Sequence, residues 1–146
     1  MGPRANSGIN DFRLTNLDGL SIYNRSSMYS AQLLDHFQNP RNAGEVADAD
    51  AIAQIENPAC GDVLRFSLKM NSGRIAEIRF KAKGCVPSMA CASALTELVA
   101  GQTADETRSL CRETLIAAVG GLPQASTHAA QLALDTLAAA LRQVKR

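Results

Sequence analysis

Four residues combine the side-chain types and positions expected of a metal-binding site. Cys60 and Asp62 stand in the stretch NPACGD, directly before a strand-like run, and Cys85 follows a second such run. His128 stands where the last helix is expected to begin. Thiolates are the ligands that zinc, copper(I) and iron–sulfur clusters prefer, and a carboxylate and an imidazole can complete a tetrahedral zinc set. These residue types therefore indicate metal or cluster binding.

The elements that must position the cysteines are predicted from alternating apolar and polar residues. The alternation covers 64–70 and 76–82, on either side of Asn71-Ser72-Gly73. Two such runs around a three-residue loop with a glycine are typical of a β-hairpin. If Met70 pairs with Arg74, apolar residues face each other along the whole hairpin, so this register is self-consistent.

The same register brings the candidate ligands together at the open end of the hairpin. It places Cys60 opposite Gly84 and next to Cys85. Asp62 then falls opposite Ala82, beside the two thiols. The hairpin therefore predicts a shared site built from residues distant in the sequence.

The remaining cysteines and the other histidine are expected to have structural roles rather than to bind a metal. Cys91 stands in an expected helix among Ala and Ser, and Cys111 belongs to another segment; both are expected to be small buried hydrophobic residues. His36 is expected to be exposed or partly packed. A disulfide between Cys60 and Cys85 is geometrically conceivable, but a reducing compartment disfavours it.

Length, charge and composition limit the classes of protein to which this chain can belong. The chain has 146 residues, enough for one domain, with 46% hydrophobic and 20% charged residues and a formal charge of +1. This charge gives no electrostatic case for nucleic acid or anionic membrane as a partner. No run approaches the ~20 apolar residues of a membrane helix, and the first residues lack the apolar centre of a secretory signal. The expected location is the cytoplasm, where the cysteines stay reduced.

The order of the elements predicts the fold class. A third strand is expected at 51–56. Helices are expected at 29–38, from Ser88 to Gly101, and over 111–119. A short helix is expected to open at the capping-box pair Thr103 and Glu106, and the last helix at a cap formed by Ser126 or Thr127. Strands followed by helices indicate an α+β fold, a small sheet with helices on one face.

The chain is expected to divide into a leader and one domain. Residues 1–27 are polar, rich in Gly, Asn and Ser, and without sustained periodicity, so they are interpreted as a flexible leader. The domain is expected to span 28–146. Met28 precedes a good helix, so Met28 is a candidate for the natural start, with the leader an upstream extension or an expression remnant.

Several stretches, in the same order, resemble the IscU/NifU family of iron–sulfur cluster assembly scaffolds. They run from about Met28 to the C-terminus and include MYSAQLLDHFQNPRNAG, NPACGD, GRIAEIRFKAKGC and GLPQASTHAAQLALDTL. The resemblance implies a three-stranded antiparallel sheet packed against helices. It also implies a nascent cluster, usually [2Fe–2S], that is held on three cysteines, an aspartate and a histidine and built with sulfur from a cysteine desulfurase.

Carried over by position, the resemblance assigns the site to Cys60, Asp62, Cys85 and His128. The third family cysteine would follow the histidine directly, where this chain has Ala129. Two further departures are LPQAS, which stands where well-known members carry LPPVK, and Val86-Pro87-Ser88, which follows Cys85 where members usually have small residues. The missing cysteine puts the sulfur-receiving step in question.

The resulting hypothesis is a scaffold or carrier, not an enzyme, that holds a cluster and passes it to recipient apoproteins. Its expected partners are a cysteine desulfurase and those recipients, with no nucleic acid or membrane, and the expected state is a monomer or homodimer. The alternatives share the fold: a zinc-binding, sulfurtransferase-like sulfur acceptor, or an adaptor that binds a desulfurase without building a cluster.

Overall fold

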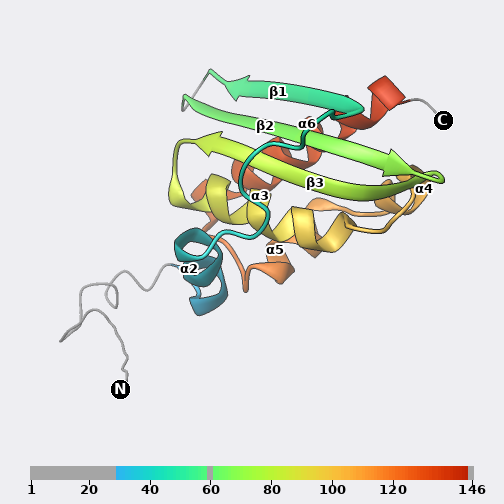
Figure 1. Ribbon diagram of the computed structural model, residues 1–146. Helices are drawn as coiled ribbons and strands as arrows, with labels where there is room; N and C mark the ends of the chain where they lie inside the picture. The colour runs from blue at the N-terminus through green and yellow to red at the C-terminus, as the bar shows by residue number, and fades with distance from the viewer. Residues whose placement is uncertain (1–28, 59–60, 145–146) are drawn as a thin grey trace. The chain divides into compact units, whose positions relative to one another are not determined.

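The structure, a computed structural model, describes residues 29–58 and 61–144. The predictions for the leader and for the position of Cys60 lie outside the described residues. The elements follow one another as shown in Figure 1: α2 (Ala31–Gln38), β1 (Ala51–Asn57), β2 (Asp62–Asn71), β3 (Arg74–Lys83), α3 (Val86–Val99), α4 (Ala104–Thr107), α5 (Arg112–Ala118), the 3-10 helix η1 (Gln124–Ser126) and α6 (His128–Val144).

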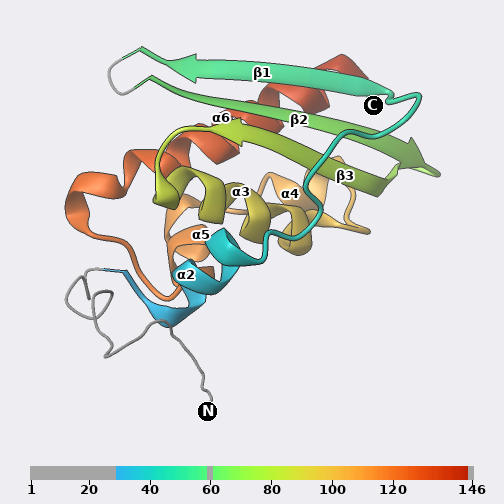
Figure 2. The same cartoon turned by 60° about the vertical axis from the view of Figure 1, so that its left-hand side comes forward.

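The three strands form one antiparallel sheet in the order β1-β2-β3. The helices α3 and α6 run along one face of this sheet, as the two views in Figures 1 and 2 agree. This arrangement confirms the predicted α+β fold with a three-stranded antiparallel sheet. In the described part of the chain, no helix is long and apolar enough to cross a membrane.

The predicted hairpin register is wrong by two positions. In the structure Leu64 pairs with Ala82, and Phe66 pairs with Phe80. The turn contains only Ser72 and Gly73, which both have positive φ (56° and 79°), as a two-residue hairpin turn of type I′ requires. This turn accounts for one position of the shift.

A β-bulge between Lys69 and Met70 accounts for the other position. Lys69 pairs with Glu77 but Met70 pairs with Ile75, so Ala76 is the extra residue on β3. As a result Ile75 is fully buried and Ala76 is exposed. The bulge is favourable because it buries the larger apolar side chain, whereas the predicted register would have buried alanine.

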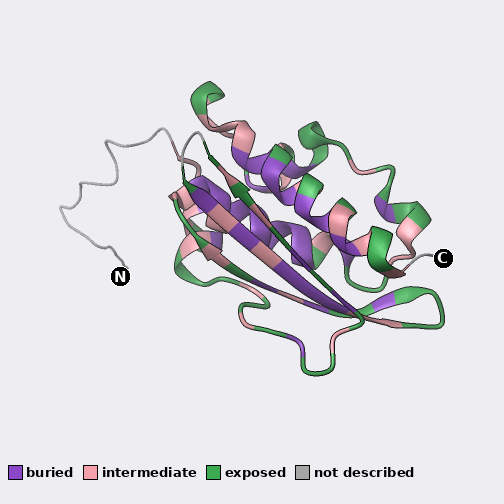
Figure 3. Ribbon diagram, turned by 90° about the horizontal axis from the view of Figure 1, so that it is seen from above, coloured by how far each residue is buried: buried purple, intermediate pink, exposed green. Residues whose placement is uncertain are grey.

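The hydrophobic core lies between the sheet and the helices. Strand residues with no more than 3% exposure meet the almost wholly buried helix α3 and the inner face of α6, where Figure 3 shows buried positions on both layers. The strand and helix residues at its centre include Leu64, Phe66, Leu68, Phe80, Leu95, Val99, Ala133 and Leu137.

Two predicted helix starts have different outcomes. The capping box is confirmed, since the Thr103 hydroxyl accepts from the Glu106 backbone N–H (3.0 Å) and the Glu106 carboxylate accepts from the Thr103 N–H (2.9 Å). Helix α3, however, begins at Val86, two residues before the predicted start at Ser88. Pro87 lies in the first turn of α3, where its missing N–H costs nothing.

The expectation for His36 is wrong, because this side chain is buried. His36 lies on α2 with 8% exposure, and its Nδ1 lies 2.8 Å from the hydroxyl oxygen of Ser93 on α3. The same oxygen accepts a hydrogen bond from the Arg41 backbone N–H (2.9 Å). His36 therefore helps to join α2 to the central helix.

The two remaining cysteines differ from each other. Cys91 is fully buried in α3, which confirms its predicted core role. Cys111 is exposed at the residue before α5, so its predicted burial is wrong. Its sulfur lies 3.3 Å from the hydroxyl oxygen of Thr114 in the first turn of α5.

Candidate metal centre

Three of the four predicted ligands meet at one end of the sheet. Asp62 is the first residue of β2, Cys85 immediately precedes α3, and His128 is the first residue of α6. One ligand atom from each residue lies within 4.8 Å of the others. Cys60 lies outside the described residues, between Pro58 and Gly61, so its approach to this group stays a prediction.

The carboxylate of Asp62 is the centre of this group. Its Oδ1 accepts a hydrogen bond from the backbone N–H of Cys85 (3.1 Å). Its Oδ2 accepts from the Ser88 hydroxyl (2.6 Å) and the Cys85 thiol (3.2 Å), and lies 3.6 Å from Nε2 of His128. Asp62 is only 2% exposed, so protein groups rather than bulk water hold its oxygens.

The corrected register explains why a glycine precedes Cys85. Because Val63 pairs with Lys83, the next position of the ladder sets Asp62, rather than Cys60, against Gly84. Gly84 has a φ of 148°, and a Cβ added to it would overlap the carboxylate oxygen Oδ1 of Asp62. Glycine is therefore required here both for its backbone conformation and for the close approach of Asp62.

The ring nitrogen of His128 that does not face Asp62, Nδ1, makes a contact that fixes the orientation of the ring. Nδ1 lies 3.3 Å from the carbonyl oxygen of Ala125 in η1, and since a carbonyl only accepts, this nitrogen is the donor. In the neutral ring Nε2 then carries the lone pair, which is the form that binds a metal. The His128 side chain is 38% exposed, so the group can be reached from solvent.

Burial raises the pKa of the Cys85 thiol above its ordinary value. Hydrogen bonds from the Ser88 side chain and backbone act in the opposite direction, and the carboxylate of Asp62 raises the pKa further. The thiol therefore keeps its proton at neutral pH in the absence of a metal. A cation that binds the sulfur must displace this proton.

The two separations from Asp62 Oδ2 are close to those expected around a tetrahedral divalent cation. Metal–oxygen and metal–nitrogen bonds of about 2.0 Å and a metal–sulfur bond of about 2.3 Å imply separations of about 3.3 Å from oxygen to nitrogen and about 3.5 Å from oxygen to sulfur. The observed separations from Asp62 Oδ2 are 3.6 Å to His128 Nε2 and 3.2 Å to Cys85 Sγ. The three ligand atoms all lie within 4.8 Å of one another, so the side chains can hold one cation once they draw closer together.

No other described cysteine replaces the missing third thiol. Ala129 follows His128, is 1% exposed, and carries only a methyl group where the family pattern has a cysteine. Burial, together with the nearby Cys85 thiol, raises the pKa of Cys91 to about 12, which keeps it protonated. Cys111 lies away from the group.

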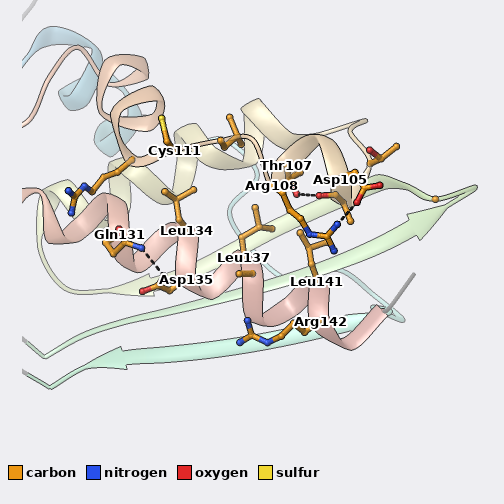
Figure 4. A pocket seen from close by; sticks show the side chains of 16 residues that line it. Asp105, Thr107, Arg108, Cys111, Gln131, Leu134, Asp135, Leu137, Leu141 and Arg142 are labelled. Carbon is orange, nitrogen blue, oxygen red and sulfur yellow. Dashed lines mark hydrogen bonds and ion pairs between the residues drawn. The ribbon is translucent and has the colours of Figure 1, made fainter.

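Cys111 instead lines a separate hollow of about 940 Å³ between α4, α5 and α6. Figure 4 shows Leu134, Leu137 and Leu141 projecting from α6 along this hollow, with Arg108 paired to Asp105 at its edge. Asp62, Cys85 and His128 do not line it. The hollow is therefore distinct from the candidate metal centre.

Sequence reasoning missed the parts played by Ser88 and Gly84. In the sequence, Ser88 stands out only as the expected start of a helix and as part of a departure from the family pattern, although its position three residues after Cys85 is a usable signal. The contact of Gly84 with Asp62 could not be found while the register was wrong by two positions.

The fold and the Asp–Cys–His group define a small α+β domain with a candidate metal centre at one end of its sheet. The chain belongs to the NifU-like N-terminal domain family, whose family model matches residues 28–146. This membership confirms the resemblance inferred from the sequence.

Individual relatives agree with this assignment. The chain is 40% identical over 114 residues to iron–sulfur cluster assembly scaffold protein IscU 1 of Archaeoglobus fulgidus, covering 78% of this chain and 74% of that protein. It is 37% identical over 121 residues to the IscU scaffold of Escherichia coli (strain K12), covering 80% and 94%. The N-terminal NifU-like protein of Brucella abortus has the same fold, with a TM-score of 0.71 at 22% identity over 83% of this chain and 96% of that one.

Proposed function

We propose that this protein is an iron–sulfur cluster assembly scaffold or carrier, which holds a nascent cluster and passes it to recipient proteins. The observation that carries the proposal is the meeting of Asp62, Cys85 and His128 in a chain of this family. Scaffold relatives at 37–40% identity support it. Under this proposal the cluster is a cargo rather than a resident cofactor, and the role is not enzymatic.

The proposed ligands are Cys60, Asp62, Cys85 and His128, which supply the four protein ligands that a [2Fe–2S] cluster needs. Oxygen and nitrogen ligands hold iron–sulfur units less firmly than thiolates do. A site with two thiolates should therefore release its cluster readily, as a carrier must. An arrangement in which two chains share one cluster, each giving Cys60 and Cys85, offers four thiolates instead.

The proposal includes partners and a location. A cysteine desulfurase supplies sulfur, and apoproteins that need a cluster receive it, with no part for nucleic acid or a membrane. The proposed location is the cytoplasm, where thiols stay reduced, as cluster assembly requires. Residues 1–27 are proposed to be a leader outside the domain of residues 28–146.

A second candidate function is a zinc-bound sulfur acceptor of the same fold. Two observations favour it: Ala129 replaces the third thiol, and the distances from Asp62 Oδ2 fit a single tetrahedral ion. Two cysteines, an aspartate and a histidine form a plausible zinc set. Under this proposal the protein holds zinc instead of building a cluster.

Anaerobic purification followed by metal analysis and visible absorption distinguishes these functions. Iron and sulfide in equal amounts, with a coloured protein, support the scaffold. Stoichiometric zinc without colour supports the zinc-bound form. Capture of a desulfurase by protein that contains neither metal, undiminished in the Cys60→Ala and Cys85→Ala variants, would instead indicate an adaptor.

A further inference from the structure

Ser88 lies at the candidate metal centre, next to Asp62 and Cys85. Its hydroxyl donates to Asp62 Oδ2 at 2.6 Å, and its oxygen lies 3.2 Å from Cys85 Sγ. Ser88 is 3% exposed. One buried hydroxyl therefore contacts two of the proposed ligands at once.

Local structure explains this placement. Ser88 lies in the first turn of α3, three residues after Cys85, so both side chains lie on the same face of the helix start. Asp62 arrives from β2 and reaches the same point because Gly84 leaves room for it. The hydroxyl thus lies where the strand and the helix meet, and burial excludes most bulk water as a substitute donor.

We propose that Ser88 is a positioning residue of the metal centre: its hydroxyl holds the Asp62 carboxylate and the Cys85 sulfur in the arrangement that receives a divalent cation. This inference rests on the proposed metal-binding function. A carboxylate oxygen has two lone pairs, so Asp62 Oδ2 can bind a cation with one and keep the Ser88 hydrogen bond with the other. Hydrogen bonds of this kind orient metal ligands, and their loss typically costs about 10–100-fold in affinity.

A serine that merely satisfies a buried carboxylate would behave differently. Its removal would lower the free energy of unfolding, but the affinity of the folded protein for a cation would stay the same. The affinity and the spectrum of the bound ion therefore separate a positioning role from a purely structural one.

The test measures Zn²⁺ affinity by competition, and the visible spectrum with Co²⁺, for the full-length protein and three variants. Ser88→Ala removes the hydroxyl, and Ser88→Thr keeps it. Ser93→Ala is the matched control, because Ser93 is a fully buried serine of the same helix that contacts His36 and Arg41. Melting temperatures with and without Zn²⁺ correct for any loss of stability, since the zinc-induced shift reports binding to the folded state.

We expect Ser88→Ala to weaken Zn²⁺ binding about 10–100-fold, to reduce the zinc-induced shift in melting temperature, and to change the ligand-field bands of Co²⁺. Ser88→Thr should bind within a few-fold of the parent, and Ser93→Ala should match the parent in affinity. Unchanged or tighter binding by Ser88→Ala would overturn the positioning role while leaving the proposed metal centre intact. A parent protein that binds neither ion would overturn the metal centre itself, and the inference with it.

Discussion

Asp62 completes the start of the helix that follows Cys85. Its Oδ1 accepts from the backbone N–H of Cys85 (3.1 Å), while its Oδ2 accepts from the thiol of the same residue (3.2 Å). Cys85 is the N-cap of α3, and its own side chain makes no capping hydrogen bond. A carboxylate at this place stabilises the helix dipole. One side chain therefore serves both the fold and the candidate metal centre.

The contact between Gly84 and Asp62 should control metal binding. In Gly84→Ala the new methyl group overlaps the carboxylate, so Asp62 and Cys85 must move apart. We expect Zn²⁺ affinity to fall at least about tenfold and the free energy of unfolding to fall by about 1–3 kcal/mol. Isothermal titration and urea unfolding measure these two quantities.

Gly73→Ala is the matched control for that variant. Gly73 also has a positive φ (79°), but an added Cβ would meet nothing within 4 Å. It should lose stability, by about 1 kcal/mol, and keep its Zn²⁺ affinity. Equal affinities for the two variants would show that the approach of Asp62 to Gly84 does not matter for binding.

The two predicted cysteine ligands should be necessary for metal binding but not for folding. Cys85 is only half-buried and its side chain does not cap α3, so Cys85→Ala should remove most bound metal while the metal-free melting temperature changes little. We expect the same of Cys60→Ala. Metal analysis after reconstitution and thermal unfolding check both statements.

Cys111→Ala provides the comparison, since Cys111 is exposed and does not belong to the group of Asp62, Cys85 and His128. It should retain the full metal content. If Cys60→Ala or Cys85→Ala retained as much metal as Cys111→Ala, the metal would be bound elsewhere. Unfolding of metal-free Cys85→Ala would mean that the thiol is a core residue.

Restoring the missing thiol should strengthen the site. Ala129 adjoins His128, so Ala129→Cys should add a third thiolate, increase the yield of reconstituted cluster, and allow sulfur to be accepted from a desulfurase persulfide. Cluster yield is measured by absorption, and sulfur transfer by mass spectrometry of the protein. Ala130→Cys is the control, because residue 130 is equally buried on α6 but turned by about 100° around the helix. If Ala129→Cys changed neither quantity, His128 would not correspond to the family histidine.

His36 should make the protein sensitive to mild acid. Burial lowers the pKa of His36, and Arg41 lowers it further, against smaller opposing effects of Glu97 and Asp35. The unfolded chain therefore binds this proton more readily than the folded protein does. The free energy of unfolding should be constant well above pH 6.5 and fall as the pH drops below the ordinary histidine pKa of about 6.5.

Urea unfolding between pH 5 and pH 8 measures this dependence. His36→Gln should be less stable at pH 8, by about 1 kcal/mol, because the hydrogen bond to Ser93 is altered. Its stability should change less between pH 8 and pH 5 than that of the parent. An equal acid slope in the two proteins would assign the sensitivity to other groups.

Local sequence patterns were sufficient for the fold class and for most elements. Alternating residues predicted the strands, and the pair Thr103 and Glu106 predicted the start of α4, because these signals depend on neighbours within a few positions. The identities of Asp62, Cys85 and His128 as candidates followed from residue type and family resemblance. These inferences needed no knowledge of packing.

The sequence could not determine quantities that depend on contacts between distant segments. The register depends on a two-residue turn and on a bulge that places Ile75 instead of Ala76 in the core, and apolar pairing alone is compatible with both registers. The exposure of Cys111 depends on how α5 packs, and the sequence does not encode it locally. The contact of Ser88 with Asp62 exists only because β2 and α3 meet there. Tertiary structure alone decided these features, since each depends on the burial of side chains from several elements in one common core.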